Sequence, residues 1–515
     1  LTTTVRIKSR IYIMSTFLIL LSLIPLTTQT TIQINQLQSI HTTDEKFASF
    51  TIDASQWRKM NLSSTKLRFL AKQLQPSVLR VGGTQEDYDI YQFGSFANFN
   101  CKDVLSPMTT YRCKTINQTQ WRSLVNFANT INASLVYGLN DLFGRPTKTK
   151  PETKQCNDNC PPRNMSNVEA FLKWNIKNMP LDTVHGWELG NELNSYFNSN
   201  KGAKEQSKDL RTLRSLVDDL YNETEYKPLI IGPDTHSSAE FSKIGLEWLN
   251  TFSQASFTDN NHNHRNNNHH NNDNDKSNAI DILTFHMYSM GNGPKLDPNN
   301  LNASFLNAAA LDKSGAGARA VSNVVKKYSK STAIWAGETA SANNGGQTGI
   351  TDTFCNGFWY LDQLGSHAAA GVDVVCRQTL ENSGGYPLIE NLDPLPDYWL
   401  IVLWKQIMGI KVLNVTSIDN VKLRAYAHCS AATATATANS NNGNNGSISI
   451  AWLNIGDKSI TLDLPEMNKD GAILWILQPG KKMNGMHNPL QSQEMKLNGI
   501  VLDLKSQTKN DSFNY

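Results

Sequence analysis

The chain of 515 residues has little charge for its size and no marked surplus of either sign. Charged residues make up 18% of it, with 48 Lys and Arg against 45 Asp and Glu. The surplus comes from Arg6, Lys8 and Arg10, because the first thirty residues hold no Asp or Glu. Without that segment the charges balance, so the basic field of a nucleic-acid-binding or membrane-surface protein is missing. Nucleic acid is therefore not an expected partner, and a polyanion would be held only by local patches.

The sequence also lacks an apolar run of the roughly 20 residues that a membrane-spanning helix needs. The apolar stretch from Phe17 to Leu26 is shorter than that, follows the three basic residues, and precedes a polar Thr-Thr-Gln-Thr run. This is the layout of a secretory signal peptide. Residues 1–30 are predicted to be a leader, with a membrane anchor as the alternative, and no transmembrane segment is expected in the mature chain.

Several common catalytic signatures are missing as well. We find no phosphate-binding Gly-Lys-Ser/Thr loop, no Gly-x-Ser-x-Gly nucleophile elbow and no His-Glu-x-x-His metalloprotease helix. The segment 315–320 fits only a loose dinucleotide-binding pattern, without a strand before it or an acidic residue after it. Neither a metal nor a nucleotide cofactor is therefore expected.

Cysteine is scarce, with seven residues in all. Cys101, Cys113, Cys156 and Cys160 lie within one third of the chain and could form two disulfides in an oxidising compartment. Cys156 and Cys160 could instead be half of a zinc site, but no second pair follows at zinc spacing. Cys376 stands in an apolar run and is predicted to be a small core residue. The odd total leaves at least one thiol free or bonded to another chain.

Asn-x-Ser/Thr sequons are frequent, as in a glycosylated secretory protein. Together with the leader, they predict a secreted or lysosome-like location. The nine sequons begin at Asn61, Asn117, Asn132, Asn164, Asn222, Asn302, Asn414, Asn445 and Asn510.

Short apolar runs alternate with stretches of helical periodicity along the first four hundred residues. Helical spacing of apolar residues is found at 166–179, 206–220 and 318–328. Eight runs separated in this way predict an α/β fold, a (β/α)8 TIM barrel, with an open doubly wound sheet as the alternative. The runs are 50–53, 78–81, 134–139, 184–189, 229–231, 280–288, 332–337 and 372–375.

The pattern changes after about residue 400, where apolar and polar residues alternate with the period of two that is typical of strands. Examples are 421–427, 447–452 and 459–464. We predict a leader over 1–30, a strand in 31–45 that joins the C-terminal domain, and a catalytic barrel over 46–399. An Asn/His-rich insertion at 259–278 interrupts the barrel, and a β-sandwich domain is predicted over 400–515.

Two glutamates stand at the predicted C-terminal ends of barrel strands, where active sites of this fold lie. Glu192 follows the fourth strand in Trp187-Glu188-Leu189-Gly190-Asn191-Glu192, and Glu338 ends the seventh in Trp335-Ala336-Gly337-Glu338. Two carboxyls that face each other across a sugar ring can hydrolyse a glycosidic bond, one as proton donor and the other as nucleophile or base. A structural glutamate that caps a helix or pairs with Arg80 is the alternative for each.

Taken together, five motifs resemble the heparanase-like endo-β-glucuronidases and β-glucuronidases of glycoside hydrolase family 79. The resemblance runs from about residue 50 to residue 499 and implies a retaining mechanism on a (β/α)8 barrel with a β-sandwich. The motifs are Gly82-Gly83-Thr84, Gly190-Asn191-Glu192, Trp335-Ala336-Gly337-Glu338-Thr339, Asp352-Thr353-Phe354 and Asp393-Pro394-Leu395-Pro396-Asp397-Tyr398-Trp399.

The resemblance implies roles for individual residues. Glu192 resembles the general acid/base and Glu338 the nucleophile, and Asn191 the partner of the sugar 2-hydroxyl. His286 and Tyr288 match positions that border the nucleophile, although a structural core histidine is the alternative for His286. The implied contacts with the glucuronate carboxylate and the sugar are Gly345, Gly346 and Tyr386, together with Asp53, Thr84 and Gln378. Arg80 could hold Glu338 ionised or form an ion pair within the barrel.

Some features depart from the animal members of that family. Leu193 stands where they have Pro after the acid, and nothing between Tyr91 and Trp121 corresponds to their long excised linker. Their Lys-rich heparin-binding cluster has no counterpart, which favours less sulfated substrates. We expect a monomeric retaining glycosidase on glucuronate-containing glycans or proteoglycans. The alternatives are an exo-acting β-glucuronidase on small glucuronides or arabinogalactan side chains, and a non-catalytic glycan-binding relative.

Overall fold

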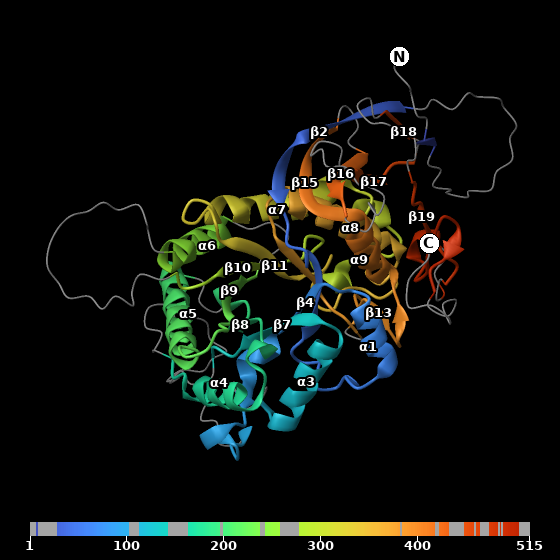
Figure 1. The fold of residues 1–515 in the computed structure, drawn as a ribbon. Coiled ribbons are helices and arrows are strands. Elements are labelled where there is room, and N and C mark those ends of the chain that lie inside the picture. The colour runs from blue at the N-terminus through green and yellow to red at the C-terminus, as the bar shows by residue number, and fades with distance from the viewer. Residues whose placement is uncertain are drawn as a thin grey trace, which may run out of the picture.

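Eight parallel strands close into a barrel at the centre of the molecule (Figure 1). The computed structural model describes residues 7–8, 28–101, 113–142, 163–195, 199–236, 243–257, 278–381, 384–417, 422–431, 447–457, 460–463, 473–482, 485 and 488–503. Each of the eight predicted runs overlaps one barrel strand, so the predicted TIM barrel is confirmed. The strands are β3 (Ala48–Asp53), β4 (Ser77–Gly82), β7 (Ala133–Leu139), β8 (Gly186–Leu189), β9 (Leu229–Thr235), β10 (Ile282–Met287), β11 (Ala333–Thr339) and β12 (Val374–Arg377).

Helices surround this barrel (Figure 1). In α5, the buried Leu210, Leu213 and Val217 recur every three or four residues and face the core, as in an amphipathic helix. The predicted helices at 166–179 and 206–220 correspond to α4 and α5. The helices are α1 (Thr65–Lys72), α3 (Gln118–Thr130), α4 (Ser166–Asn178), α5 (Asn200–Leu220), α6 (Lys243–Ser256), α7 (Ala308–Val325), α8 (Phe354–Ala369) and α9 (Pro396–Ile407).

Helix α7 begins at Ala308, ten residues before the predicted start at 318. Gly315 and Gly317 lower helix propensity, so the sequence pattern did not predict a helix before residue 318. A Cβ atom on Gly315 would lie 2.9 Å from the Cβ of Ser366 in α8, so the glycine permits close packing of the two helices. The loose dinucleotide pattern at 315–320 therefore lies inside a helix and has a packing role.

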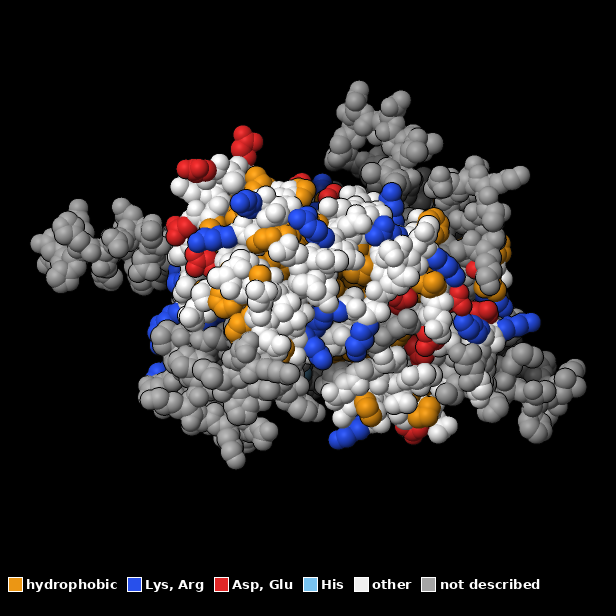
Figure 2. Space-filling view, turned by 90° about the horizontal axis from the view of Figure 1, so that it is seen from below, with side chains coloured by type: hydrophobic (Ala, Val, Ile, Leu, Met, Phe, Trp, Pro, Cys, Tyr) orange, Lys and Arg blue, Asp and Glu red, His pale blue; other side chains and the backbone are white. Residues whose placement is uncertain are grey.

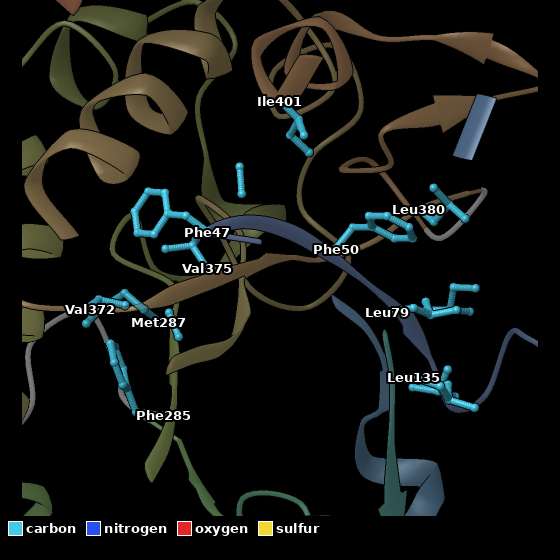
Figure 3. Packing of buried hydrophobic residues seen from close by; sticks show 14 of the residues in the cluster. Phe47, Phe50, Leu79, Leu135, Phe285, Met287, Val372, Val375, Leu380 and Ile401 are labelled. Atoms are coloured by element: carbon cyan, nitrogen blue, oxygen red, sulfur yellow. The ribbon is translucent and has the colours of Figure 1, made fainter. Parts of the chain in front are cut away.

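The barrel strands bury side chains on both faces because each strand alternates direction. Leu79 and Leu135 belong to the large core between the strands and the helices (Figure 3). Val78 and Val136, one residue away, belong to a separate cluster that collects side chains from six barrel strands. Only the barrel lumen brings six strands together, and Cys376 lies in this cluster, as predicted for a small core residue.

A six-stranded sheet lies beside the barrel (Figure 1). Its order is β1-β18-β2-β15-β16-β17, and β2 pairs with β15, so the predicted strand before the barrel does join the C-terminal strands. The predicted domain boundary at 399 falls within α9. The strands are β1 (Ile7–Lys8), β2 (Thr28–Thr42), β15 (Met408–Ser417), β16 (Leu423–Ser430), β17 (Ile448–Asn454) and β18 (Ile460–Asp463).

Smaller sheets complete the described structure. Strands β19 (Leu477–Pro479), β20 (Met495–Leu497) and β21 (Ile500–Val501) form an antiparallel sheet near the C-terminus. Strands β13 (Ile389–Glu390) and β14 (Asp393–Pro394) form a short hairpin. Residues 259–277 of the predicted insertion lie outside the described residues. None of the described helices is both long and apolar enough to span a membrane.

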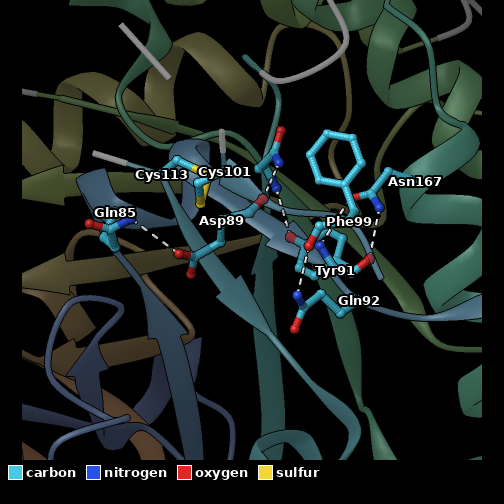
Figure 4. The surroundings of a disulfide bond; sticks show 9 residues. Gln85, Asp89, Tyr91, Gln92, Phe99, Cys101, Cys113 and Asn167 are labelled. Carbon is cyan, nitrogen blue, oxygen red and sulfur yellow. Dashed lines mark hydrogen bonds between the residues drawn. A yellow bond between two sulfur atoms is a disulfide. The ribbon is translucent and has the colours of Figure 1, made fainter. Parts of the chain in front are cut away.

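A disulfide joins Cys101 and Cys113, two of the four cysteines expected to form disulfides (Figure 4). It stands beside two short parallel strands, β5 (Asp89–Tyr91) and β6 (Lys114–Ile116). The side chain of Asn167 in α4 holds Tyr91 through both backbone groups, at 3.0 Å from its N–H and 2.8 Å from its carbonyl. Cys156 and Cys160 lie outside the described residues.

Candidate active site

The predicted catalytic residues meet at the C-terminal ends of the barrel strands. Glu338 is the sixth residue of β11, and Glu192 comes three residues after β8 ends at Leu189. The parallel register of β10 and β11 pairs His286 with Glu338. Since parallel strands end on the same face of the barrel, these side chains converge there.

A tight turn places Glu192 after β8. Gly190 and Glu192 both have positive φ angles, of 76° and 54°. A Cβ atom on Gly190 would lie 2.4 Å from Leu193 and 2.8 Å from Asp141, so only glycine fits there. The backbone N–H of Glu192 donates to the carbonyl of Asp234 in β9 at 2.9 Å, which holds the strained residue in place.

The two carboxyl groups are close together. One carboxylate oxygen of Glu192, one of Glu338 and a ring nitrogen of His286 all lie within 4.8 Å of one another. Carboxyl groups about 5 Å apart are typical of glycosidases that retain anomeric configuration, whereas inverting enzymes leave a wider gap for water.

Glu338 is bound by Arg80 and Tyr288. The guanidinium of Arg80 is fully buried and donates from Nη1 to Glu338 Oε2 at 2.8 Å and from Nε to Glu188 at 2.7 Å. The hydroxyl of Tyr288 donates to the other oxygen of Glu338. Burial raises the pKa of Glu188 to about 8, against the opposing effect of Arg80. Arg80 therefore neutralises the charge of Glu338, while Glu188 tends to keep its proton.

Glu192 is bound by two histidines. Its Oε1 atom lies 2.9 Å from Nδ1 of His286 and 3.1 Å from Nδ1 of His236. Burial opposes the ionisation of Glu192, but these hydrogen bonds and the histidine charges bring its pKa below the usual range. The free site therefore favours an ionised Glu192, although an acid catalyst must be protonated when it acts.

His286 links Glu192 to a further carboxylate. Its Nε2 atom lies 3.2 Å from Asp234 Oδ1. Burial opposes protonation of His286, but Glu338, Asp234 and Glu192 raise its pKa to about 10. Burial likewise opposes ionisation of Asp234, whose pKa nevertheless falls to about 2 beside Arg80 and His286. His286 is therefore a charged member of the site.

The predicted sugar-contacting residues Asp53 and Gln378 touch each other beside this centre. Gln378 Nε2 donates to Asp53 Oδ2 at 3.2 Å, and Gln378 Oε1 accepts from Thr51. Tyr386 packs against Tyr288, and burial, together with the charges of Glu338 and Asp53, raises the pKa of its hydroxyl.

Gly345, Gly346 and Thr84 are the remaining predicted contacts with the substrate. The Gly346 N–H already donates to the Asn343 carbonyl at 3.2 Å, whereas we find no acceptor for the Gly345 N–H within the described parts of the chain. Gly346 packs against the Tyr386 ring. Thr84 is exposed at the start of a short 3-10 helix, Thr84–Tyr88, and has no side-chain hydrogen bond among the described residues.

Sequence reasoning missed several charged residues of the site. Asp234 is the sixth residue of β9 and His236 the first residue after it, so the rule that selected Glu192, a polar residue at a strand's C-terminal end, could have found them. Asp87 is buried, and its two oxygens accept the backbone N–H groups of Asn191 at 3.0 Å and Asp141 at 2.9 Å. Burial raises the pKa of Asp87 to about 7.

Glu192, His286 and Glu338 carry atom types that can bind metal. Both oxygens of Glu338, both ring nitrogens of His286 and one oxygen of Glu192 already have partners, which include Arg80, Tyr288, His236 and Asp234. The two cations, Arg80 and His286, also supply positive charge where a metal would. This chemistry suits acid–base catalysis by carboxyls better than metal ligation.

The chain is similar to one family model and to several known proteins. The model of "Glycosyl hydrolase family 79, N-terminal domain" matches residues 29–365. Heparanase-like protein 3 of Arabidopsis thaliana is 29% identical over 394 residues, 75% of this chain and 65% of that protein, so the match spans just under two thirds of the relative. Baicalin-beta-D-glucuronidase of Scutellaria baicalensis is 27% identical over 510 residues, 92% of this chain and 86% of that enzyme.

A solved structure of a 4-O-alpha-L-rhamnosyl-beta-D-glucuronidase from Fusarium oxysporum aligns over 78% of each chain, with a TM-score of 0.48 and 17% identity. The family match extends over more than half of the chain and includes both Glu192 and Glu338. We conclude that the chain belongs to glycoside hydrolase family 79.

Proposed function

We propose that the enzyme hydrolyses β-glucuronidic linkages in glucuronate-containing glycans with retention, Glu338 acting as nucleophile and Glu192 as acid/base. The observation that carries this proposal is the approach of the two carboxyl groups to within 4.8 Å. At this separation Glu338 can attack the anomeric carbon directly while Glu192 protonates the leaving oxygen. Water then hydrolyses the glycosyl-enzyme, with Glu192 taking its proton.

The surroundings of each carboxyl support this division of roles. A nucleophile must be ionised, and Glu338 accepts hydrogen bonds from Arg80 and Tyr288. Its side chain is 9% exposed, against 23% for Glu192. Glu192 is thus the carboxyl nearer to solvent, where an aglycone can leave.

Recognition of glucuronate requires donors for a carboxylate. We assign this role to the Gly345 N–H and the Tyr386 hydroxyl, with Gly346 allowing the close approach of that ring. Asp53 and Gln378 already share a hydrogen bond and are placed to bind sugar hydroxyls. We assign Asn191 to the hydrogen bond with the sugar 2-hydroxyl and Thr84 to a more distant contact with the substrate.

The substrate is expected to carry little sulfate. On the face shown in Figure 2, Lys and Arg side chains are spread among uncharged and acidic ones instead of forming one basic patch. A relative that matches nearly the whole chain is named as a β-D-glucuronidase of baicalin. An exo-acting enzyme on small glucuronides or arabinogalactan side chains is the second candidate.

Aglycone release from 4-methylumbelliferyl β-glucuronide tests the mechanism. Wild type should turn over, Glu338→Gln should be inactive, and Glu225→Gln, at an exposed residue that precedes β9 and so lies away from the C-terminal strand ends, should match wild type. Proton NMR should detect the β-anomer of glucuronic acid as the first product. Equal turnover by Glu338→Gln, or an α-anomer first, would contradict the proposal.

A non-catalytic glycan-binding protein would release nothing from any glucuronide while still binding it. The presence of both carboxyls argues against that alternative. Product sizes from heparan sulfate, hyaluronan and arabinogalactan distinguish the modes of cleavage. An early fall in mean chain length indicates endo action, and steady release of monosaccharide indicates exo action.

We also propose that the enzyme is a secreted or lysosomal monomeric glycoprotein. Support comes from the Cys101–Cys113 disulfide and from the exposure of every sequon asparagine that the structure describes. Endoglycosidase treatment should lower its apparent mass, and light scattering should give the mass of one chain. The exposed asparagines are Asn61, Asn117, Asn132, Asn164, Asn222, Asn302 and Asn414.

A further inference from the structure

His236 is built into the active site by the turn that carries Glu192. It is the first residue after β9, and its backbone N–H donates to Asn194 Oδ1 at 2.9 Å. Its carbonyl accepts from Asn194 Nδ2 at 3.1 Å. Asn194 stands two residues after Glu192, so this double hydrogen bond fixes the imidazole relative to the carboxyl that it faces.

The two histidines bind the same oxygen of Glu192. His286 and His236 both direct Nδ1 at Oε1, at 2.9 and 3.1 Å. No described residue bonds to Oε2 of Glu192, so Oε2 is the oxygen open to a glycosidic bond. The histidines therefore hold the carboxyl without blocking the atom that would act on substrate.

The two histidines differ in their surroundings. His286 is fully buried and has carboxylates on both sides, Glu192 and Asp234, with Glu338 and the Arg80 cation also nearby. His236 is 29% exposed, and Glu192 is its one hydrogen-bonded ring partner among the described residues, with the charges of His286 and Glu338 beyond it. His236 can therefore exchange a proton with water, whereas His286 cannot do so readily.

We propose that His236 is a positioning residue that shares one proton with Glu192, and that the imidazole sets the basic limb of the enzyme's pH–rate profile. In the resting form both ring nitrogens of His236 are protonated and Glu192 is ionised. In the reactive form His236 has lost its Nε2 proton, Glu192 carries a proton on Oε2, and the Nδ1–H still donates to Oε1. The inference rests on the proposed acid/base role of Glu192.

The catalytic cycle returns this proton to the pair. Glu192 Oε2–H protonates the leaving oxygen as the C1–O bond breaks and the Glu338–C1 bond forms. Water then attacks C1, Glu192 takes the proton of that water, and Glu338 leaves. Proton balance is preserved without any other reactant.

The test compares kcat/KM against pH for wild type and His236→Asn with 4-methylumbelliferyl β-glucuronide. Asparagine can still donate near the Nδ1 position but cannot titrate. In wild type the pair keeps its proton until the imidazolium loses it, and hydrogen bonding to Glu192 raises the pKa of His236 above 6.5. In the His236→Asn variant only the Glu192 carboxyl can lose the proton. The midpoint of the basic limb should therefore move to lower pH by at least about one unit.

His185→Asn is the matched control. His185 is also partly buried, but it precedes β8 and stacks on Trp335 at the opposite end of the strand from Glu192. Its substitution should leave the basic limb in place. With a 2,4-dinitrophenyl glucuronide, whose leaving group needs no protonation, the His236→Asn shift should disappear.

An unchanged basic limb in His236→Asn, with a uniform loss at every pH, would overturn the inference and leave a structural role. Should that variant fold poorly, histidine NMR of wild type and Glu192→Gln gives the same answer. The pKa of His236 should fall in Glu192→Gln, and an unchanged value would refute the pairing. Full activity of Glu338→Gln would instead refute the proposed function, so the two failures are distinguishable.

Discussion

Arg80 of the second barrel strand donates from Nη1 to Oε2 of Glu338, 258 residues later in the chain, at 2.8 Å. The same guanidinium binds Glu188 through Nε at 2.7 Å and lies 3.5 Å from Asp234. The sequence left two alternatives for Arg80, holding Glu338 ionised or forming an ion pair within the barrel. Both alternatives describe this one contact. One buried cation contacts acidic side chains from three other strands.

Replacing Arg80 with lysine should therefore reduce catalysis. A single ammonium cannot bind Glu188 and Glu338 together as the planar guanidinium does. Breaking a buried ion pair costs about 3–5 kcal/mol, so we expect kcat/KM to fall by at least about 100-fold and the melting temperature to fall as well. Arg424→Lys, at the Asp362 contact between the sheet and α8, is the control. It should lower stability and leave kcat/KM of the folded enzyme unchanged. Normal turnover by Arg80→Lys would refute the role.

Tyr288→Phe should weaken the nucleophile while keeping the ring. The lost hydroxyl donates to Glu338, and hydrogen bonds to charged groups are worth about 1.5–3 kcal/mol. This corresponds to a loss of roughly 10- to 100-fold in kcat/KM on an aryl glucuronide. Tyr226→Phe removes a hydroxyl that binds the Val184 carbonyl at 2.8 Å, away from the strand ends, and should have no effect on kcat/KM. A twofold or smaller change in Tyr288→Phe would count against the contact.

Asp87→Asn should disturb the turn that carries Glu192. Both oxygens of Asp87 accept backbone N–H groups, from Asn191 and Asp141. An asparagine offers one oxygen and one NH2 group, so one buried N–H loses its acceptor at a cost of about 1–3 kcal/mol. Chemical denaturation should show this loss, and kcat should fall more than KM changes. Asp218→Asn, at a surface pair with Lys227, should alter neither quantity.

Buried His367 should make the fold sensitive to acid. Burial lowers its pKa to about 3, and its Nε2 lies 3.0 Å from the Ser314 hydroxyl between α7 and α8. Between pH 6.5 and about 3 the unfolded chain binds a proton that the folded chain refuses, so stability falls as pH falls. The slope from this group is at most about 1.4 kcal/mol per pH unit. Urea midpoints of His367→Gln should decline less than those of wild type from pH 6.5 to 4. Parallel declines would show that another group is responsible.

The eight barrel strands could be predicted because a parallel strand that is covered on both faces is a short run of mostly apolar residues. The same segments made Glu192 and Glu338 candidates, because active sites of this fold lie at the C-terminal ends of the barrel strands. Helix α7 was predicted ten residues short because its glycines are explained only by the neighbouring α8, which the local pattern does not contain.

The sequence by itself determined the barrel, the strand before it that joins the C-terminal sheet, and the two candidate carboxyls, because each depends on periodicity or position within one segment. Only the tertiary structure decided which charges meet. Arg80, Glu188 and Asp234 come from three strands and His236 follows the last of them, so their separation depends on closure of the barrel. The ionisation of Glu192 was likewise undecided by sequence, because a pKa depends on burial and on partners distant in the chain.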